Sequence, residues 1–371
     1  MRLYDYIIES ASRALILQQE DGSMLPGYNG PHHHSETPIR NTCHWLITFL
    51  KVYEITGQKK FLKASKKCIG YILKERKKYR YNLPYRYMKG KDQCNGLIGP
   101  AWTMEALIVA SKGLKRKDLS HIASEIFLMH KFDTKKGLWH RKEVNGKDLD
   151  IDWTFNHQLW FASIGSMLNK NEYPEVHNQI EIFIKKLESN FSVYKNGLIW
   201  HKVALIPFDI SGLKIIVSNI LIKSLKREKE IYRAIGYHQF NLYAFAILMD
   251  TYPQISFWDG KKFKRALQFI KSKKYEKGLK NNKYGFDYNV AGIEIAYVLQ
   301  EFFKGSRDLQ RYWLQKQFER NYNNEEKMLS GHTEDSLTLA ARIYEATRLD
   351  NIMLDNLSIK NYENISNNTC I

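Results

Sequence analysis

The chain has 371 residues and a formal net charge of +18. It contains no run close to the roughly 20 apolar residues of a membrane-spanning helix. It also lacks the Walker A, dinucleotide-binding, GxSxG and HExxH motifs, which argues against nucleotide-dependent enzymes, α/β-hydrolases and zinc proteases.

Two kinds of helix are predicted to alternate along the chain. The first kind has apolar residues at three-to-four spacing and charged residues on the other face, as in a helix that borders solvent. Its members are residues 3–17, 61–77, 117–130, 175–190, 261–273 and 307–320. The second kind has a polar, aromatic or glycine-containing start and is then apolar nearly all round, which predicts burial on several sides. Its members start at Asn41, Gly99, Asp152, Tyr237, Asn289 and Thr333.

Six outer and six inner helices predict an all-α fold, an (α/α)6 toroid formed by one domain over residues 1–357. The Asn-rich tail, 358–371, is expected to be disordered. One interval, 191–236, is too long for a simple connection and predicts a helical insertion at the rim. It would act as a lid, as extra packing or as a membrane-surface contact. Strand-like alternation is confined to short pieces such as 198–203.

The inner helices of a toroid all point the same way, so their free N–H groups and positive dipole ends gather at one mouth. The strongest candidate site lies at the third of these starts, where Asp152 is followed by His157 and flanked by Trp153 and Trp160. Sugars need such groups, because their C–H faces stack on indoles and their hydroxyls take fixed hydrogen bonds. Asp152 also occupies an expected helix N-cap, a role that stabilises by roughly 0.5–2 kcal/mol.

A second candidate lies at the preceding inner helix, in KDQCNGLIGPAWTMEA. Asp92 and Asn95 are predicted on the loop before this helix, and Trp102 one turn inside it. Pro100 is typical of a first helical turn. Glu105 is expected to be buried and paired with an Arg or Lys.

Histidines recur near other inner-helix starts, as His44, His238 and His332. Such a residue is usually structural, but four of them, counting His157, predict convergence on one pocket. Neighbouring aromatic residues are assigned to substrate binding with them. The aromatic candidates are Trp45, Tyr237 and Tyr288.

Two further polar groups have simpler interpretations. The triplet His32–His34 is expected in a loop, although it could line the mouth or bind metal adventitiously. Acids near the last two inner helices are expected mainly to cap their helices, as the dipole favours. They are Asp287, Glu294, Glu334 and Asp335.

The segments NGLIGPAWTMEAL, DWTFNHQLWFA, YHQFNLYAFA and SLTLAARIYEATRL resemble the six-hairpin glycosidase superfamily. The resemblance is to proteins related to glycoside hydrolase family 88 in surface-glycan gene clusters, including the archaeal agl type. It covers most of the chain and implies an (α/α)6 barrel that acts on a glycan. In the superfamily's unsaturated uronyl hydrolases, an Asp opening an inner helix protonates the C4=C5 double bond and a second Asp assists. Asp152 matches the first of these, and Asp92 matches the second loosely.

We therefore predict a glycoside hydrolase acting on an acidic, uronic-acid-containing oligosaccharide or lipid-linked glycan in surface-polysaccharide metabolism. Asp152 would be the general acid/base, with His157 as its partner and Asp92 as the second acid. The alternatives are a sugar epimerase or polysaccharide lyase that uses His157, His238 and Tyr237, or a glycan-binding protein without activity.

Partners and location follow from composition and spacing. The charge fits a solvated surface as well as an anionic partner and is compatible with peripheral membrane contact; no nucleic-acid-reading motif is present. The four cysteines lack CxxC or disulfide-framework spacing, and a zinc site built on Cys43 and His44 lacks a second cysteine in matching context. The first residues begin an amphipathic helix rather than a signal peptide. We predict a cytoplasmic protein with no metal, no cofactor and no nucleic-acid partner.

Overall fold

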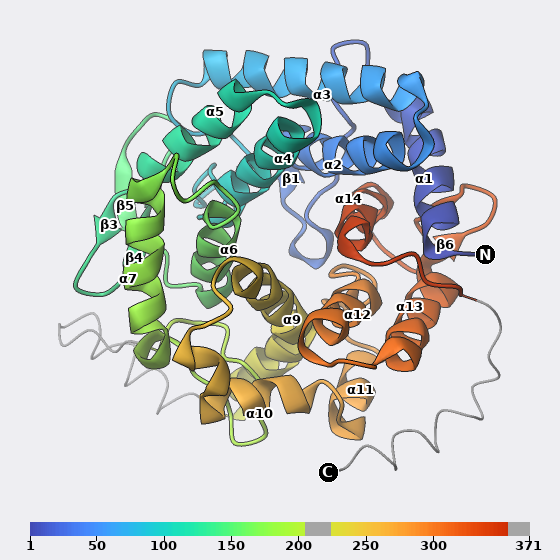
Figure 1. The fold of residues 1–371 in the computed structure, drawn as a ribbon. Helices are drawn as coiled ribbons and strands as arrows, with labels where there is room; N and C mark the ends of the chain where they lie inside the picture. Colours follow the sequence, from blue (N-terminus) through green and yellow to red (C-terminus); the bar gives the residue numbers. More distant parts are fainter. Residues whose placement is uncertain (205–223, 355–371) are drawn as a thin grey trace.

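Two concentric layers of helices alternate along the chain and close into a ring (Figure 1). The computed structural model describes residues 1–204 and 224–354. The outer layer is α1 (Leu3–Leu17), α3 (Lys59–Lys78), α5 (Lys117–Leu128), α7 (Pro174–Asn190), α10 (Lys261–Phe269) with the short α11 (Lys273–Leu279), and α13 (Arg307–Asn321). The inner layer is α2 (Ile39–Thr56), α4 (Ile98–Leu114), α6 (Phe155–Gly165), α9 (Ser224–Thr251), α12 (Ala291–Phe302) and α14 (Ser336–Ala341), which continues as the 3-10 helix η3 (Arg342–Arg348).

Burial separates the two layers as the sequence predicts. Residues 39–50 of α2, 98–108 of α4 and 291–299 of α12 are buried without a break. The outer helix α3 buries only one stripe, from Phe61 to Ile72, and exposes its lysines. Each inner helix packs on the next, and η3 contacts both α12 and α2 and so closes the ring. The predicted (α/α)6 toroid is confirmed.

Short strands lie in the connections between helices. β1 (Ser35–Glu36) pairs with β2 (Arg86–Tyr87), and β6 (Tyr322–Asn323) pairs with β7 (Met328–Leu329). A three-stranded antiparallel sheet is formed by β3 (Phe132–Asp133), β4 (Leu138–Lys142) and β5 (Asp148–Ile151). The sequence does not predict this sheet, because strands of two to five residues carry too little alternation to be recognised. This hairpin leads the chain directly to the start of α6.

The predicted insertion, 191–236, begins as an extended segment and ends as helix. Lys202 bridges to Thr154, and the backbone N–H of Phe155 donates to the carbonyl of His201, so this segment lies beside the start of α6. α9 begins at Ser224, well before the predicted start at Tyr237. The apolar centre of the predicted lid, 205–223, and the tail from 355 lie outside the described residues. Among the described helices, none combines the length and the apolar character needed to cross a membrane.

Buried ion pairs join η3 to α12 and α4. The Arg342 guanidinium contacts Glu294 at 2.9 Å and Glu345 at 2.6 Å, with all three side chains almost fully buried. Arg348 contacts Glu105 at 2.6 Å, which confirms the predicted pairing of Glu105. Burial raises the pKa of Glu294 well above its usual range, and the neighbouring Glu345 raises it further. Arg342 therefore holds together two carboxyl groups that would be costly to bury alone.

Replacing Arg342 with Met should lower the free energy of unfolding by about 3–5 kcal/mol, because it leaves Glu294 and Glu345 buried without their cation. Urea denaturation would measure the loss. The matched control is Arg307→Met, since Arg307 pairs with Asp350 at the surface and should contribute no more than about 1 kcal/mol. Equal effects of the two substitutions would contradict the assignment.

Candidate active site

A pocket of about 430 Å³ opens where the inner helices begin, at the end of the ring that we call the mouth. Its lining includes two carboxylates, six cationic side chains and four imidazoles, among other groups. The carboxylates are Asp92 and Asp152; the cations are Arg40, Arg86, Lys91, Arg141, Arg233 and Arg342; the imidazoles are His32, His34, His157 and His201.

Among the residues that the structure describes, the pocket lining carries more positive than negative charge. Arg40 is neutralised by the buried Glu36 at 3.0 Å, and Arg342 by the buried ion pairs described above. Arg233 and Lys91 have no ion-pair partner within 4.0 Å among residues 1–204 and 224–354. Unpaired cations beside a concave site attract anions, so the pocket favours a ligand with negative charge.

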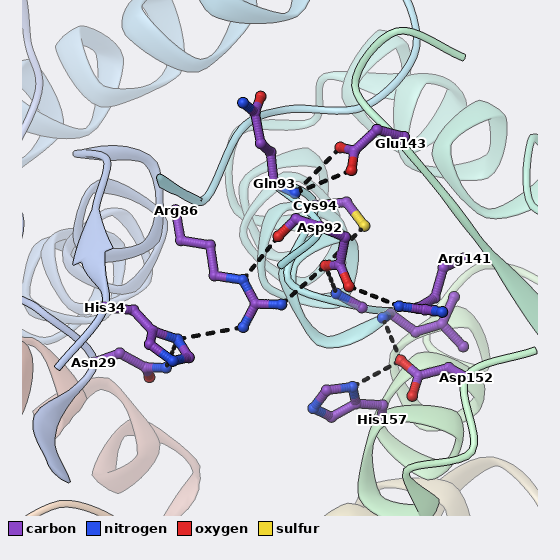
Figure 2. A network of polar contacts seen from close by, with 12 residues as sticks. Asn29, His34, Arg86, Asp92, Gln93, Cys94, Arg141, Glu143, Asp152 and His157 are labelled. Carbon is purple, nitrogen blue, oxygen red and sulfur yellow. Dashed lines mark hydrogen bonds and ion pairs between the residues drawn. The ribbon is translucent and has the colours of Figure 1, made fainter. Parts of the chain in front are cut away.

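Asp152 and His157 form a hydrogen-bonded pair in the lining of the pocket (Figure 2). Nδ1 of His157 donates to Oδ2 of Asp152 at 2.7 Å, and the same oxygen accepts the backbone N–H of Leu97 at 3.0 Å. Oδ1 accepts the backbone N–H of Thr154 at 3.1 Å. Burial alone would raise the pKa of Asp152, but His157 and the backbone donors outweigh burial and lower it. The carboxylate is thus ionised and can only accept, so it fixes a proton of His157 on Nδ1, and Nε2 is the ring nitrogen left to exchange a proton with a ligand.

Asp152 is not the N-cap that the sequence predicts. Thr154 occupies that position, because β5 ends at Ile151 and the helix begins at Phe155. The carboxylate instead connects the start of α6 with Leu97, the N-cap residue of α4. Its position is thus set by two neighbouring inner helices.

Asp92 lies between two arginines. It contacts Arg86 at 3.0 Å and Arg141 at 2.8 Å, and accepts the backbone N–H of Gly96 at 2.9 Å (Figure 2). Burial opposes ionisation, but Arg86, Gly96, Cys94 and Arg141 together lower the pKa of Asp92 to about 2. A carboxylate held this way stays ionised at neutral pH. Its environment disfavours the predicted role as second acid and favours the positioning of Arg86 and Arg141.

The structure brings seven of the twelve predicted site residues to the pocket. They are Asp92, Asn95, Trp102, Asp152, His157, Tyr237 and Tyr288. The other five do not line it: His44, Trp45, Trp153, Trp160 and His238.

The other three histidines predicted near inner-helix starts, His44, His238 and His332, do not line the pocket, which corrects the expectation drawn from their similar positions. His238 lies in the middle of α9 and points to the outer layer, where Nδ1 accepts from Ile199 N and Nε2 contacts the carbonyl of Ala266. His44 is buried on α2 and stacks on Tyr344, with ring centroids 4.2 Å apart. His332 is exposed. The sequence predicts that this inner helix starts at Tyr237, but α9 begins at Ser224, so His238 lies inside the helix and not at its start.

The three predicted tryptophans outside the lining pack in the protein interior. The Trp160 indole is fully buried and donates to the carbonyl of Phe240 at 3.2 Å. Trp45 is buried beside Phe49, and Trp153 is half-buried against the core. These placements do not support a sugar-stacking role.

Acids at the later helix starts also have structural partners. Asp335 caps α14 by accepting the backbone N–H of Thr338 at 3.2 Å, as the sequence predicts. Asp287 forms an ion pair with Arg320, and Glu334 contacts His33 at the surface. None of these three acids lines the pocket.

The sequence interpretation missed several pocket residues, His201 and Arg233 above all. Burial, then the charge of Arg233, lowers the pKa of His201 to about 3, so its ring is neutral, and its buried Nδ1 has no hydrogen-bond partner in the described part of the chain. One signal could have found it: GLIWHK, from Gly197, repeats the pattern of GLWHRK, from Gly137. His32, one of the predicted loop triplet, lines the pocket and contacts the Tyr237 hydroxyl at 2.8 Å. No cluster of three or more His, Cys, Asp or Glu side chains suited to a metal ion occurs within 1–204 and 224–354.

Gly96→Ala should disrupt the hydrogen-bonded pair of Asp152 and His157. Gly96 has φ +64°, and a Cβ atom there would lie 2.3 Å from Oδ2 of Asp152 and 2.5 Å from Nδ1 of His157. Gly90→Ala is the matched control, because Gly90 has φ +77° and open space around it, so only the backbone strain is shared. The NMR chemical shifts of the His157 ring should change in the Gly96 variant and stay near wild type in the control, because only the Gly96 variant displaces the ring from Asp152.

Asp92→Asn should lower stability at neutral pH and flatten its acid dependence. The folded pKa of about 2 lies below the ordinary 3.8, so this stabilisation is present above pH 3.8 and is lost as pH falls through about 2. The difference corresponds to about 2 kcal/mol. Urea unfolding at several acidic pH values would measure it, with the exposed surface residue Asp118→Asn as control. A variant whose acid dependence equals that of wild type would contradict the assignment.

Comparisons with known proteins place the fold and the family. No family profile matches the chain. Solved structures share the fold: a D-mannose isomerase (TM-score 0.62, 11% identity, 93% of this chain and 96% of that one), cellobiose 2-epimerase of Bacillus thermoamylovorans (0.61, 10%, 93% and 98%) and an α-1,6-mannanase of Salegentibacter sp. (0.57, 9%, 93% and 98%). These identities show the six-hairpin fold alone.

Sequence similarity to one curated protein is much stronger. The chain is 36% identical over 362 residues to archaeal glycosylation protein Q of Haloferax volcanii, which covers 94% of this chain and 97% of that protein. The chain therefore belongs to the family of archaeal glycosylation protein Q.

Proposed function

We propose that this protein is a glycan-processing enzyme that acts on an anionic sugar, with the Asp152–His157 pair as its proton-transfer centre. The observation that carries the proposal is this pair, fixed by two helix starts, inside a pocket with excess positive charge. The name of the curated relative, a glycosylation protein, supports a glycan substrate. The fold is shared with sugar isomerases, epimerases and mannanases and is consistent with it.

The lining suits a sugar that carries a carboxylate, as a uronic acid does. Arg233 and Lys91 are free to form charge-assisted hydrogen bonds with the carboxylate. Trp102, Tyr237 and Tyr288 provide faces on which a sugar ring can stack.

The geometry favours proton transfer at a sugar carbon. His157 Nε2 would remove the proton from the carbon next to the carboxylate, and the cations of the pocket would stabilise the negative charge that develops. Burial raises the pKa of Tyr237 well above its usual range, so its phenol keeps a proton that it can donate. Return of a proton to the opposite face gives epimerisation, whereas expulsion of the group on the next carbon gives β-elimination.

Hydrolysis, the reaction predicted from the sequence, is the second candidate. It is favoured by the two carboxylates that face one pocket from neighbouring inner-helix starts. It requires a protonated acid at the glycosidic oxygen, whereas Asp92 and Asp152 both have lowered pKa values. The mechanism of unsaturated uronyl hydrolases, in which Asp152 would protonate a double bond, also needs a protonated acid. It stays a prediction, because the pKa of Asp152 is lowered.

Product analysis on uronic-acid oligosaccharides separates the reactions. Epimerisation should place deuterium from heavy water on the carbon next to the carboxylate, elimination should create ultraviolet absorbance, and hydrolysis should place solvent oxygen at a new reducing end. We expect deuterium exchange to accompany turnover. Solvent oxygen in the product without deuterium would favour hydrolysis instead.

Asp152→Asn should lower kcat by about 10²–10⁴, because the amide no longer fixes the His157 proton on Nδ1. The matched control is Asp287→Asn, since Asp287 also precedes an inner helix but lies outside the pocket. Steady-state kinetics would be measured on variants whose circular dichroism and Tm show a normal fold. Full activity of a folded Asp152 variant would exclude the proposed centre.

A further inference from the structure

We propose that the mouth of the toroid docks on an anionic lipid bilayer through residues 77–91, which we call the lip. The proposal rests on the proposed function, which identifies the ligand of the pocket as an anionic glycan. It adds that this glycan is presented to the pocket at a membrane surface.

The composition of the lip is unusual for a solvated connection. Its fifteen residues, KKYRYNLPYRYMKGK, include six Lys or Arg, four Tyr and one Met, and no acidic residue. Lys77, Lys78, Arg80, Lys89 and Lys91 are all exposed. Lys91 also lines the pocket, so the basic surface continues to its rim.

Large side chains with apolar surface are also exposed in the lip. Tyr87 is 52% exposed and Met88 42% exposed, next to the pocket residue Arg86. Two further exposed aromatic residues, Trp200 and Tyr232, directly precede the pocket residues His201 and Arg233. Four large exposed side chains thus lie within two residues of the pocket lining along the chain, and exposed apolar surface of this kind is costly unless something covers it.

A bilayer satisfies both features. Lysines near an anionic membrane are attracted to the headgroups, and tyrosine and methionine lie at the boundary between headgroups and acyl chains. A soluble polyanion would neutralise the lysines but leave Met88 in water. Charge complementarity together with the exposed apolar residues therefore favours a membrane, and docking would place the pocket over the headgroup layer.

Binding to vesicles tests the proposal without any turnover. Wild-type protein should co-sediment with phosphatidylglycerol vesicles, bind phosphatidylcholine vesicles weakly, and dissociate as NaCl rises. Each lysine near an anionic surface contributes about fivefold in partitioning. Lys77→Gln/Lys78→Gln/Lys89→Gln should therefore lose at least about tenfold, and Tyr87→Ser/Met88→Ser should also bind more weakly.

The matched control lies on the same helix at its far end. Lys59→Gln/Lys63→Gln/Lys66→Gln removes the same charge from exposed positions at the start of α3, away from the mouth, and should bind nearly as wild type. Equal loss in this control, equal binding to both lipids, or equally lip-dependent binding to a DNA duplex would overturn the proposal. Since the assay needs no substrate, vesicle binding without sugar turnover would count against the proposed function alone, and the converse against docking alone.

Discussion

The site depends on the hydrogen bonds that the carboxylate of Asp152 accepts. One oxygen accepts from the start of α4 and from His157, and the other from the start of α6. The distance between two inner helices, the tautomer of an imidazole and the ionisation of the acid are thus set together. A buried acid without these donors would be protonated, and His157 would lose its orientation.

Positively charged side chains occur in two settings, buried between the inner helices and around the mouth. In the interior, Arg342 and Arg348 are matched by glutamates, so their charge supports packing. At the mouth, Arg86 and Arg141 share Asp92, while Arg233 and Lys91 have no acidic partner in the described residues. The excess charge is therefore concentrated where the pocket opens, where it can act on a ligand without destabilising the core.

The fold could be predicted from sequence because helix periodicity and polar helix starts are local properties. The site could be predicted in part: Asp152 and His157 lie on one helix start, and their meeting follows from their spacing. The contact of Asp152 with Leu97 spans 55 residues, and the pocket position of His201 depends on a segment returning to α6, so neither could be inferred locally. His238 was misplaced because the true start of α9 lies thirteen residues before Tyr237.

The absence of a side chain at Gly96 has a consequence for related sequences: the residue at this position decides whether the Asp152–His157 pair can form. Any larger residue there would occupy the space in which the Asp152 carboxylate and the His157 ring meet. A relative that keeps the acid and the histidine but replaces this glycine cannot keep the pair in its present geometry. The glycine is thus a marker by which members of the family that can form this pair are distinguished from members that cannot.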